Sequence, residues 1–159
     1  MRGRPRSGSA TLSWLLWAGL ALVLVRAPTA RADEPDARFV ARLVAQSFFR
    51  GLIEGDISTV QPLCASTMSF DGERVRGDAA VKARLEQLAD RARQGGLDLK
   101  KVEVIPVREA IQRFGPPPER IKAEVRPGNI VALARFNVLG AVAVLGRQSG
   151  FWRIHALTD

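Results

Sequence analysis

The stretch from Asn129 to Leu157 reads NIVALARFNVLGAVAVLGRQSGFWRIHAL, and it decides the fold class. Its apolar and β-branched residues form three runs that are separated by Gly140 and by the turn-forming residues 147–150. Short turns between such runs join antiparallel strands. The sequence therefore predicts an antiparallel meander at the end of the chain. Its strands cover about residues 129–137, 141–147 and 151–157.

The second of these strands is apolar on both faces, whereas the first is apolar on one face and mixed on the other. Along the first, Ile130, Ala132, Ala134 and Phe136 share one face, which we expect to lie against helices. A sheet that is apolar on both sides needs a cover on each side. The second cover is either another copy of the chain, as a homodimer through the outer sheet face, or the proline-rich segment 108–125 of the same chain.

Helical spacing of apolar residues predicts three helices before these strands. The first buries Phe39, Val40, Leu43, Val44, Phe48 and Leu52. Asp56 caps a second, short helix (57–64), and Asp78 caps a third with Val81, Leu85 and Leu88 on its buried face. Residues 97–107 alternate like a strand, but the parity of their apolar residues changes, which predicts a bulge at Lys100–Lys101. The order of elements is typical of an α+β fold, with helices packed on one face of a curved sheet.

The N-terminal segment has the three parts of a secretory signal peptide. Arginines precede the apolar run WLLWAGLALVLV (14–25), and the small-residue site Ala30-Arg31-Ala32 follows it. Twelve helical residues span about 18 Å, less than the roughly 30 Å of a bilayer core, so we expect cleavage and no stable membrane anchor. The predicted organisation is a signal peptide (1–32), a flexible lead-in (33–38) and one domain (39–159), exported to the periplasm or the medium.

Composition excludes several classes of function. The only charged residues among the first 32 are five arginines, so their removal lowers the net charge from +8 to +3. The remaining basic residues alternate with acids, and we expect no nucleic-acid partner. The single cysteine, Cys64, cannot form an intramolecular disulfide, and its apolar neighbours predict a small buried side chain. With one histidine and no motif for a phosphate or a metal, we expect no cofactor and no metal ion.

Several short motifs occur in a characteristic order. Gly55-Asp56 precedes a short helix, Phe70-Asp71-Gly72 and Val75-x-Gly77 precede the third helix, and Gly150-Phe151-Trp152-Arg153-Ile154 lies near the end. In this order the chain resembles the nuclear transport factor 2-like superfamily, which includes SnoaL-like cyclases and ketosteroid isomerases. The resemblance implies a cone-shaped α+β fold, a pocket between the helices and the concave sheet, and frequent homodimers. The proline-rich segment departs from the plainest pattern of the family.

Candidate site residues follow from this layout. We expect Phe39, Phe70, Val104, Phe136 and Trp152 to line an apolar pocket. The weak catalytic candidates are Asp71, Glu73, Glu103 and His155, where Glu103 either pairs with Arg135 in a cleft or lies in a salt bridge on the outer face. If Trp152 and Ile154 face the core, His155 faces outward. The chain has no tyrosine, so the usual oxyanion donors of ketosteroid isomerases cannot be carried over.

These patterns favour an exported, non-catalytic domain that binds a small apolar ligand or a partner protein. Whether the protein is an enzyme stays open, because a SnoaL-like isomerase, cyclase or hydrolase that uses pocket carboxylates is the main alternative. A structural subunit of the cell envelope is the second alternative. An enzyme of this kind needs at least two of the candidate side chains to converge in one pocket.

Overall fold

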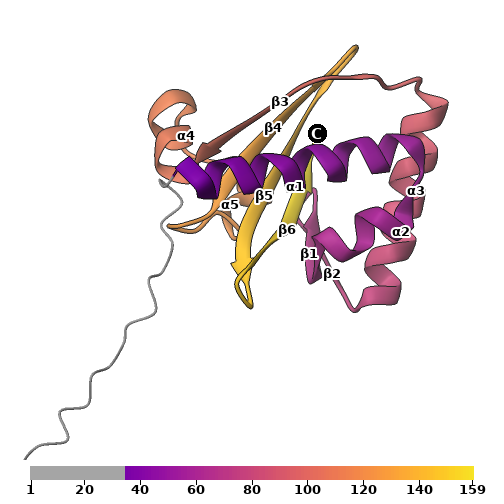
Figure 1. The fold of residues 1–159 in the computed structure, drawn as a ribbon, viewed down its shortest axis with the longest axis horizontal. Coiled ribbons are helices and arrows are strands. Elements are labelled where there is room, and N and C mark those ends of the chain that lie inside the picture. Colours follow the sequence, from indigo (N-terminus) through magenta and orange to yellow (C-terminus); the bar gives the residue numbers. More distant parts are fainter. Residues whose placement is uncertain (1–34) are drawn as a thin grey trace, which may run out of the picture.

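In the computed structural model, which describes residues 35–159, helices packed on one curved sheet make up an α+β domain (Figure 1). The N-terminal half contains α1 (Pro35–Glu54), α2 (Ile57–Val60), the 3-10 turn η1 (Gln61–Leu63), β1 (Cys64–Phe70), β2 (Glu73–Arg76) and α3 (Asp78–Gln94). The C-terminal half contains β3 (Leu99–Pro106), α4 (Val107–Phe114), α5 (Glu119–Lys122), β4 (Ile130–Phe136), β5 (Gly140–Gln148) and β6 (Phe151–Thr158).

The strands form one six-stranded sheet in the order β2-β1-β6-β5-β4-β3. The predicted meander of β4, β5 and β6 is confirmed, and these strands pair antiparallel. The sheet is not wholly antiparallel, because β1 runs parallel to β6. No turn joins these two strands, so their relative direction is set by how the two halves of the chain pack together.

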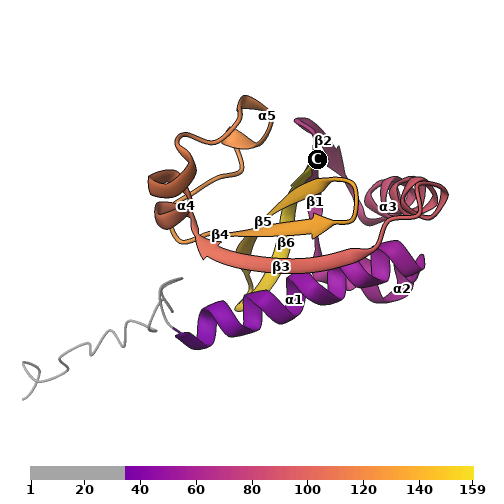
Figure 2. The ribbon, with the colours of Figure 1, turned by 90° about the horizontal axis from the view of Figure 1, so that it is seen from above.

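Each face of the curved sheet has its own cover (Figure 2). The helix α1 lies along one face, and the inner residues of β4 that the sequence indicated are all buried in the core beneath it. On the opposite face, the segment with α4 and α5 packs through Ile121 and Val125 against Val144 and Ala156. The proline-rich segment is therefore the second cover. The outer sheet face therefore does not need a second copy of the chain to cover it. The homodimer stays a prediction.

The buried face of α1 differs from the expected one. Ala37, Ala41 and Ala45 face the core, whereas Phe39 and Leu43 are 61% and 47% exposed. Alanines four residues apart form a flat stripe, which lets a helix approach the sheet closely, so the larger side chains of the first turns point outward. The burial predicted for Phe48 and Leu52 is confirmed, whereas Phe39 lies on the exposed side of α1.

Bulges in β3 and β6 change which face of the sheet the following side chains take. The predicted irregularity in β3 is confirmed, because the register of β3 with β4 shifts between Leu99 and Lys101. The sequence did not predict the second bulge. Leu145 pairs with Ile154 and Val144 pairs with Ala156, which leaves His155 as an extra residue in β6. A bulge shifts the alternation by one residue, so Leu157 joins Trp152 and Ile154 in the core.

The helix boundaries also test the sequence reading. Asp56 caps α2 as predicted, and its carboxylate accepts a hydrogen bond from the Thr59 amide at 3.2 Å. Asp78 is instead the first residue of α3, and the cap position belongs to Gly77, whose φ of 88° favours glycine. The helix α1 begins at Pro35, where the missing amide proton costs no hydrogen bond, so the folded domain includes residues 35–38.

Candidate functional site

An apolar cavity of about 270 Å³ lies between α1, α3 and the concave side of the sheet. Its walls come from five places in the fold: the end of α1, the end of α3, the turn after β1, the β4–β5 hairpin and the end of β6. Three phenylalanine rings contribute to it, and Phe49 and Phe136 meet edge to face with their centroids 5.9 Å apart. The apolar lining residues are Phe49, Leu52, Phe70, Leu88, Ala92, Leu97, Phe136, Val138, Leu139, Ala141 and Leu157.

Four polar or charged residues also line this cavity, namely Asp71, Arg91, Thr158 and Asp159. The hydroxyl of Thr158, a buried residue, donates to the Asp71 carboxylate at 2.7 Å. The guanidinium of Arg120 lies 3.7 Å from the same carboxylate and donates to the main-chain oxygen of Asp159. The cavity is therefore apolar inside and carries its charges on the exposed residues at its edge.

Local sequence signals place the two loops that border the cavity. Asp71 and Gly72, with φ of 51° and 90°, form the tight turn between β1 and β2. Both residue types tolerate this left-handed conformation, as the Asp-Gly pair predicts. On the other side of the cavity, the side-chain amide nitrogen of Asn137 donates to the Gly96 carbonyl at 3.0 Å. The side-chain oxygen of Asn137 accepts a hydrogen bond from the backbone amide of Asp98 at 3.0 Å. Asn137 thus ties the β4–β5 hairpin to the end of α3.

The structure sorts the predicted ligand-binding residues into three groups. Phe70 and Phe136 line the cavity. Val104 and Trp152 are buried in the core, outside the cavity lining. Phe39 is exposed on α1.

The sequence reading missed Arg91 and the pair Val138–Leu139. The pair is apolar although it lies in a hairpin turn, and Val138 is 71% exposed. Apolar residues in a turn are the signal that could have indicated these positions.

The four catalytic candidates do not share a site. Asp71 borders the cavity, whereas the carboxylate of the neighbouring Glu73 lies outside the lining, 3.7 Å from Arg84. Glu103 lies on the outer face, where the Arg113 guanidinium donates to it at 2.8 Å and holds the pKa of its carboxyl below the usual value. Its partners are therefore Arg113 and Lys101, as the salt-bridge alternative predicted, although Arg135 is not one of them.

His155 faces the outer side of the sheet, as predicted, but it is half-buried beneath the segment that follows α5. Its ring packs over Gly146, where an added Cβ would lie 3.0 Å from Nε2. Within the described residues Nε2 is buried without a hydrogen-bond partner. Burial lowers the pKa of the His155 imidazole, and the charge of Glu124 opposes this shift. A neutral ring with no carboxylate in contact lacks the orienting partner of a general base.

Solved structures with similar folds share this arrangement of helices and sheet. One is a protein of unknown function from Pectobacterium atrosepticum, with 13% identity, a TM-score of 0.51, and coverage of 79% of this chain and 90% of its own. A protein of unknown function with a cystatin-like fold from Nostoc punctiforme has 10% identity, a TM-score of 0.50 and coverage of 79% and 90%. A nuclear transport factor 2-like protein of unknown function from Cytophaga hutchinsonii has 9% identity, a TM-score of 0.45 and coverage of 74% and 86%.

The chain has the α+β fold of these proteins, which is called cystatin-like in the Nostoc punctiforme structure. This confirms the α+β fold, with helices on a curved sheet, that the resemblance to the nuclear transport factor 2-like superfamily implied. No model of a protein family and no curated protein matches the sequence. Because one fold supports many functions, and the identities are below 25%, the function must be argued from the site itself.

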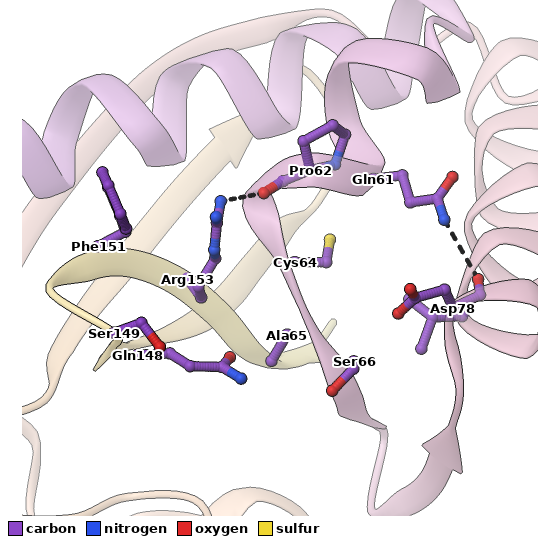
Figure 3. A pocket seen from close by; sticks show the side chains of 11 residues that line it. Gln61, Pro62, Cys64, Ala65, Ser66, Asp78, Gln148, Ser149, Phe151 and Arg153 are labelled. Carbon is purple, nitrogen blue, oxygen red and sulfur yellow. Dashed lines mark hydrogen bonds between the residues drawn. The ribbon is translucent and has the colours of Figure 1, made fainter.

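A second cleft of this domain lies between η1, the start of β1 and the β5–β6 hairpin (Figure 3). Its volume is about 460 Å³, and its lining is mostly polar. Arg153 points to the Pro62 carbonyl and donates to it. The Cys64 thiol donates to the Val60 carbonyl at 3.4 Å, and burial raises its pKa to about 12. A thiol that stays protonated at neutral pH is a poor nucleophile, so this cleft offers no reactive group at Cys64.

Among residues 35–159, no three histidine, cysteine, aspartate or glutamate side chains lie together as they would around a metal ion. No helix in the same range has the length and apolar character needed to cross a bilayer. The predicted signal peptide lies outside the described residues.

Proposed function

We propose that this protein is an exported, non-catalytic domain that binds a small apolar molecule in the cavity between α1, α3 and the sheet. The observation that carries the proposal is the cavity of about 270 Å³ with three phenylalanines in its wall. Ligand sites are concave and mostly apolar, with a few polar groups that set orientation. Asp71, Arg91 and Thr158 supply such groups at the edge of this cavity.

The contents of the cavity favour binding over catalysis. Of the four candidate catalytic side chains, only Asp71 borders the cavity, and its carboxylate already accepts a hydrogen bond from Thr158. An isomerase or hydrolase needs a base and a second group on the opposite side of the reacting atom. Glu103 and His155 lie on the outer face of the sheet, where Glu103 pairs with Arg113 and the His155 ring packs over Gly146. Export is supported by the apolar run and small-residue site of residues 1–32.

A cavity-filling variant tests the proposal. Ala92 lines the cavity from α3, so Ala92→Leu places a larger side chain in the space that the ligand would occupy. The matched control is Ala110→Leu, which adds the same group to the groove under α4 on the outer face. Native mass spectrometry of protein purified from its own host should show a bound small molecule in the unmodified protein and in Ala110→Leu, but not in Ala92→Leu.

A purified probe gives the same test without the natural ligand. The uncharged probe 2-naphthalenemethanol should bind the unmodified protein in isothermal titration, and Ala92→Leu should weaken this binding by about tenfold or more, since the space is filled. Circular dichroism establishes that both variants are folded. Equal binding to Ala92→Leu, or no binding to the unmodified protein, would contradict the proposed site.

A further inference from the structure

We infer that the molecule bound in this cavity is a monocarboxylic acid, with its apolar body among the phenylalanines and its carboxylate outside them at Arg91. This inference rests on the proposed function and adds the chemical class of the ligand. It combines three observations: the apolar interior, the state of the charged groups around the cavity, and the cavity volume.

The interior sets where a charged group can lie. Phe49, Phe70, Phe136 and Leu157 are between 1% and 8% exposed, and they offer no hydrogen bond to a ligand. Moving an unpaired charge into such surroundings is strongly unfavourable, because the charge loses its hydration without gaining a partner. A charged ligand group must therefore stay at the edge of the cavity, among the exposed residues.

Arg91 is the basic residue of the cavity lining, and its guanidinium is free to bind a ligand. It lies on the same face of α3 as Leu88 and Ala92, which also line the cavity. Within the described residues no carboxylate lies within salt-bridge distance of its guanidinium. By contrast, the next arginine on this helix, Arg93, is 2.5 Å from the Asp90 carboxylate.

The Asp71 carboxylate at the same edge is already engaged by a cation. Arg120 lies 3.7 Å from the Asp71 carboxylate, and it also donates to the main-chain oxygen of Asp159. Thr158 donates to Asp71 as well. A ligand amine would have to compete with Arg120 for these groups, whereas a ligand carboxylate meets Arg91 without a competitor. The planar guanidinium also matches a carboxylate with two parallel hydrogen bonds.

The volume limits the apolar body of the acid. An apolar cavity of roughly 150 Å³ accommodates benzene. The cavity here, about 270 Å³, therefore suits a body of about two fused rings or a chain of about eight to ten carbons. The edge-to-face rings of Phe49 and Phe136 favour an aromatic body.

Three naphthalene probes with different head groups test the inference. They are 2-naphthoate, the uncharged 2-naphthalenemethanol and the cationic 2-naphthylmethylammonium, each titrated into the full domain at pH 7. We expect 2-naphthoate to bind about tenfold more tightly than the alcohol, because a charge-assisted hydrogen bond exceeds a neutral one. Arg91→Gln should remove this preference and leave the alcohol affinity within about twofold, since the apolar body still fits.

A matched variant separates the role of Arg91 from the general charge of the helix. Arg93→Gln removes the same charge two residues away, outside the cavity lining, and should leave all three affinities within about twofold, because exposed charges are screened by salt. Arg91→Lys keeps the charge without the planar fork, and we expect an intermediate affinity for 2-naphthoate. Because Arg91 is exposed, these variants should fold normally.

The outcomes distinguish the inference from the proposed function. If the alcohol binds but 2-naphthoate binds no more tightly, or if Arg91→Gln leaves the preference intact, the inference is wrong and the apolar site stands. Tighter binding of the ammonium probe would likewise overturn it and would assign the head-group site to the acids. If none of the three probes binds, the proposed function fails together with the inference.

Discussion

Phe39 and Phe70 are the same side chain in opposite surroundings. Phe39 is 61% exposed on α1, whereas Phe70 is 2% exposed between the core and the cavity. Truncating a buried phenylalanine removes its transfer free energy and leaves a void, but truncating an exposed one does neither. The pair therefore separates burial from chemical identity.

We expect Phe70→Ala to lower the free energy of unfolding by about 3 to 5 kcal/mol. Phe39→Ala should change it by no more than about 0.5 kcal/mol, as is usual for surface positions. Urea denaturation followed by circular dichroism measures both values. Equal effects for the two variants would contradict the assignment of α1, in which the alanine stripe and not Phe39 faces the core.

His155 makes stability depend on pH. Burial lowers the pKa of its imidazole in the folded protein below the unfolded value of about 6.5. Between the two pKa values the unfolded chain binds more protons, so stability rises with pH in that window and falls as the pH decreases below about 6.5. The stabilisation that depends on a neutral His155 is fully present above about pH 6.5, and it is lost as the pH falls through the folded-state pKa.

We expect His155→Gln to reduce this dependence. The measurement is the free energy of unfolding of both proteins from pH 7.5 to pH 5, where the difference between them isolates His155 from the carboxyl groups. The stability of the unmodified protein should fall more steeply as the pH decreases, because glutamine does not titrate. Parallel curves would show that the imidazole is as well solvated in the folded protein as in the unfolded chain.

The segment from α4 to α5 covers the outer face of the sheet. Ile121 is 3% exposed and packs on Val144 and Ala156. The ion pair between Arg74 and Glu124, at 2.5 Å, ties the end of this segment to β2. Burial of Ile121 is therefore the main contact that we expect to hold α5 on the sheet.

Ile121→Ala should lower the free energy of unfolding by about 2 to 5 kcal/mol, as truncation of a buried isoleucine does. Ile111→Ala is the matched control on α4, where the side chain is 43% exposed, and its effect should be much smaller. Chemical denaturation of the two variants measures the difference. A negligible effect of Ile121→Ala would mean that α5 does not stay packed on the sheet in solution.

The homodimer predicted from the sequence concerns the whole molecule. A homodimer through the outer sheet face would place the second copy against α4 and α5, where Phe114 is 61% exposed, and not against the strands directly. If this dimer forms, sedimentation equilibrium at micromolar concentration should give twice the mass of one chain, and Phe114→Glu should return it to one. A single-chain mass for the unmodified protein would rule the dimer out.

The elements could largely be predicted from the sequence, but the orientation of α1 could not. Residues 129–157 show the alternation and turn residues of a meander, and the parity change at Lys100–Lys101 indicates the bulge in β3. For α1, both the alanines and the larger apolar residues fall at helical spacing. Which set faces the sheet depends on how closely the helix approaches it, and that distance is a property of the packed layers.

Only part of the cavity lining could be predicted from the sequence, for the same reason. Phe70 and Phe136 could be predicted because each lies on the apolar face of a strand. Arg91 and Val138 could not, since they join the cavity only when the end of α3 and the β4–β5 hairpin meet through the hydrogen bonds of Asn137. Leu157 likewise lines the cavity because of the bulge at His155, which no residue type indicated.

The sequence by itself determined the α+β class, the C-terminal meander, the caps at Asp56 and the tight turn at Asp71-Gly72, because local propensity and periodicity decide these features. Tertiary structure alone decided the parallel pairing of β1 with β6, the second cover of the sheet and the set of residues around the cavity. Each of these depends on contacts between segments far apart in the chain, whose free energy is realised only when the layers pack together.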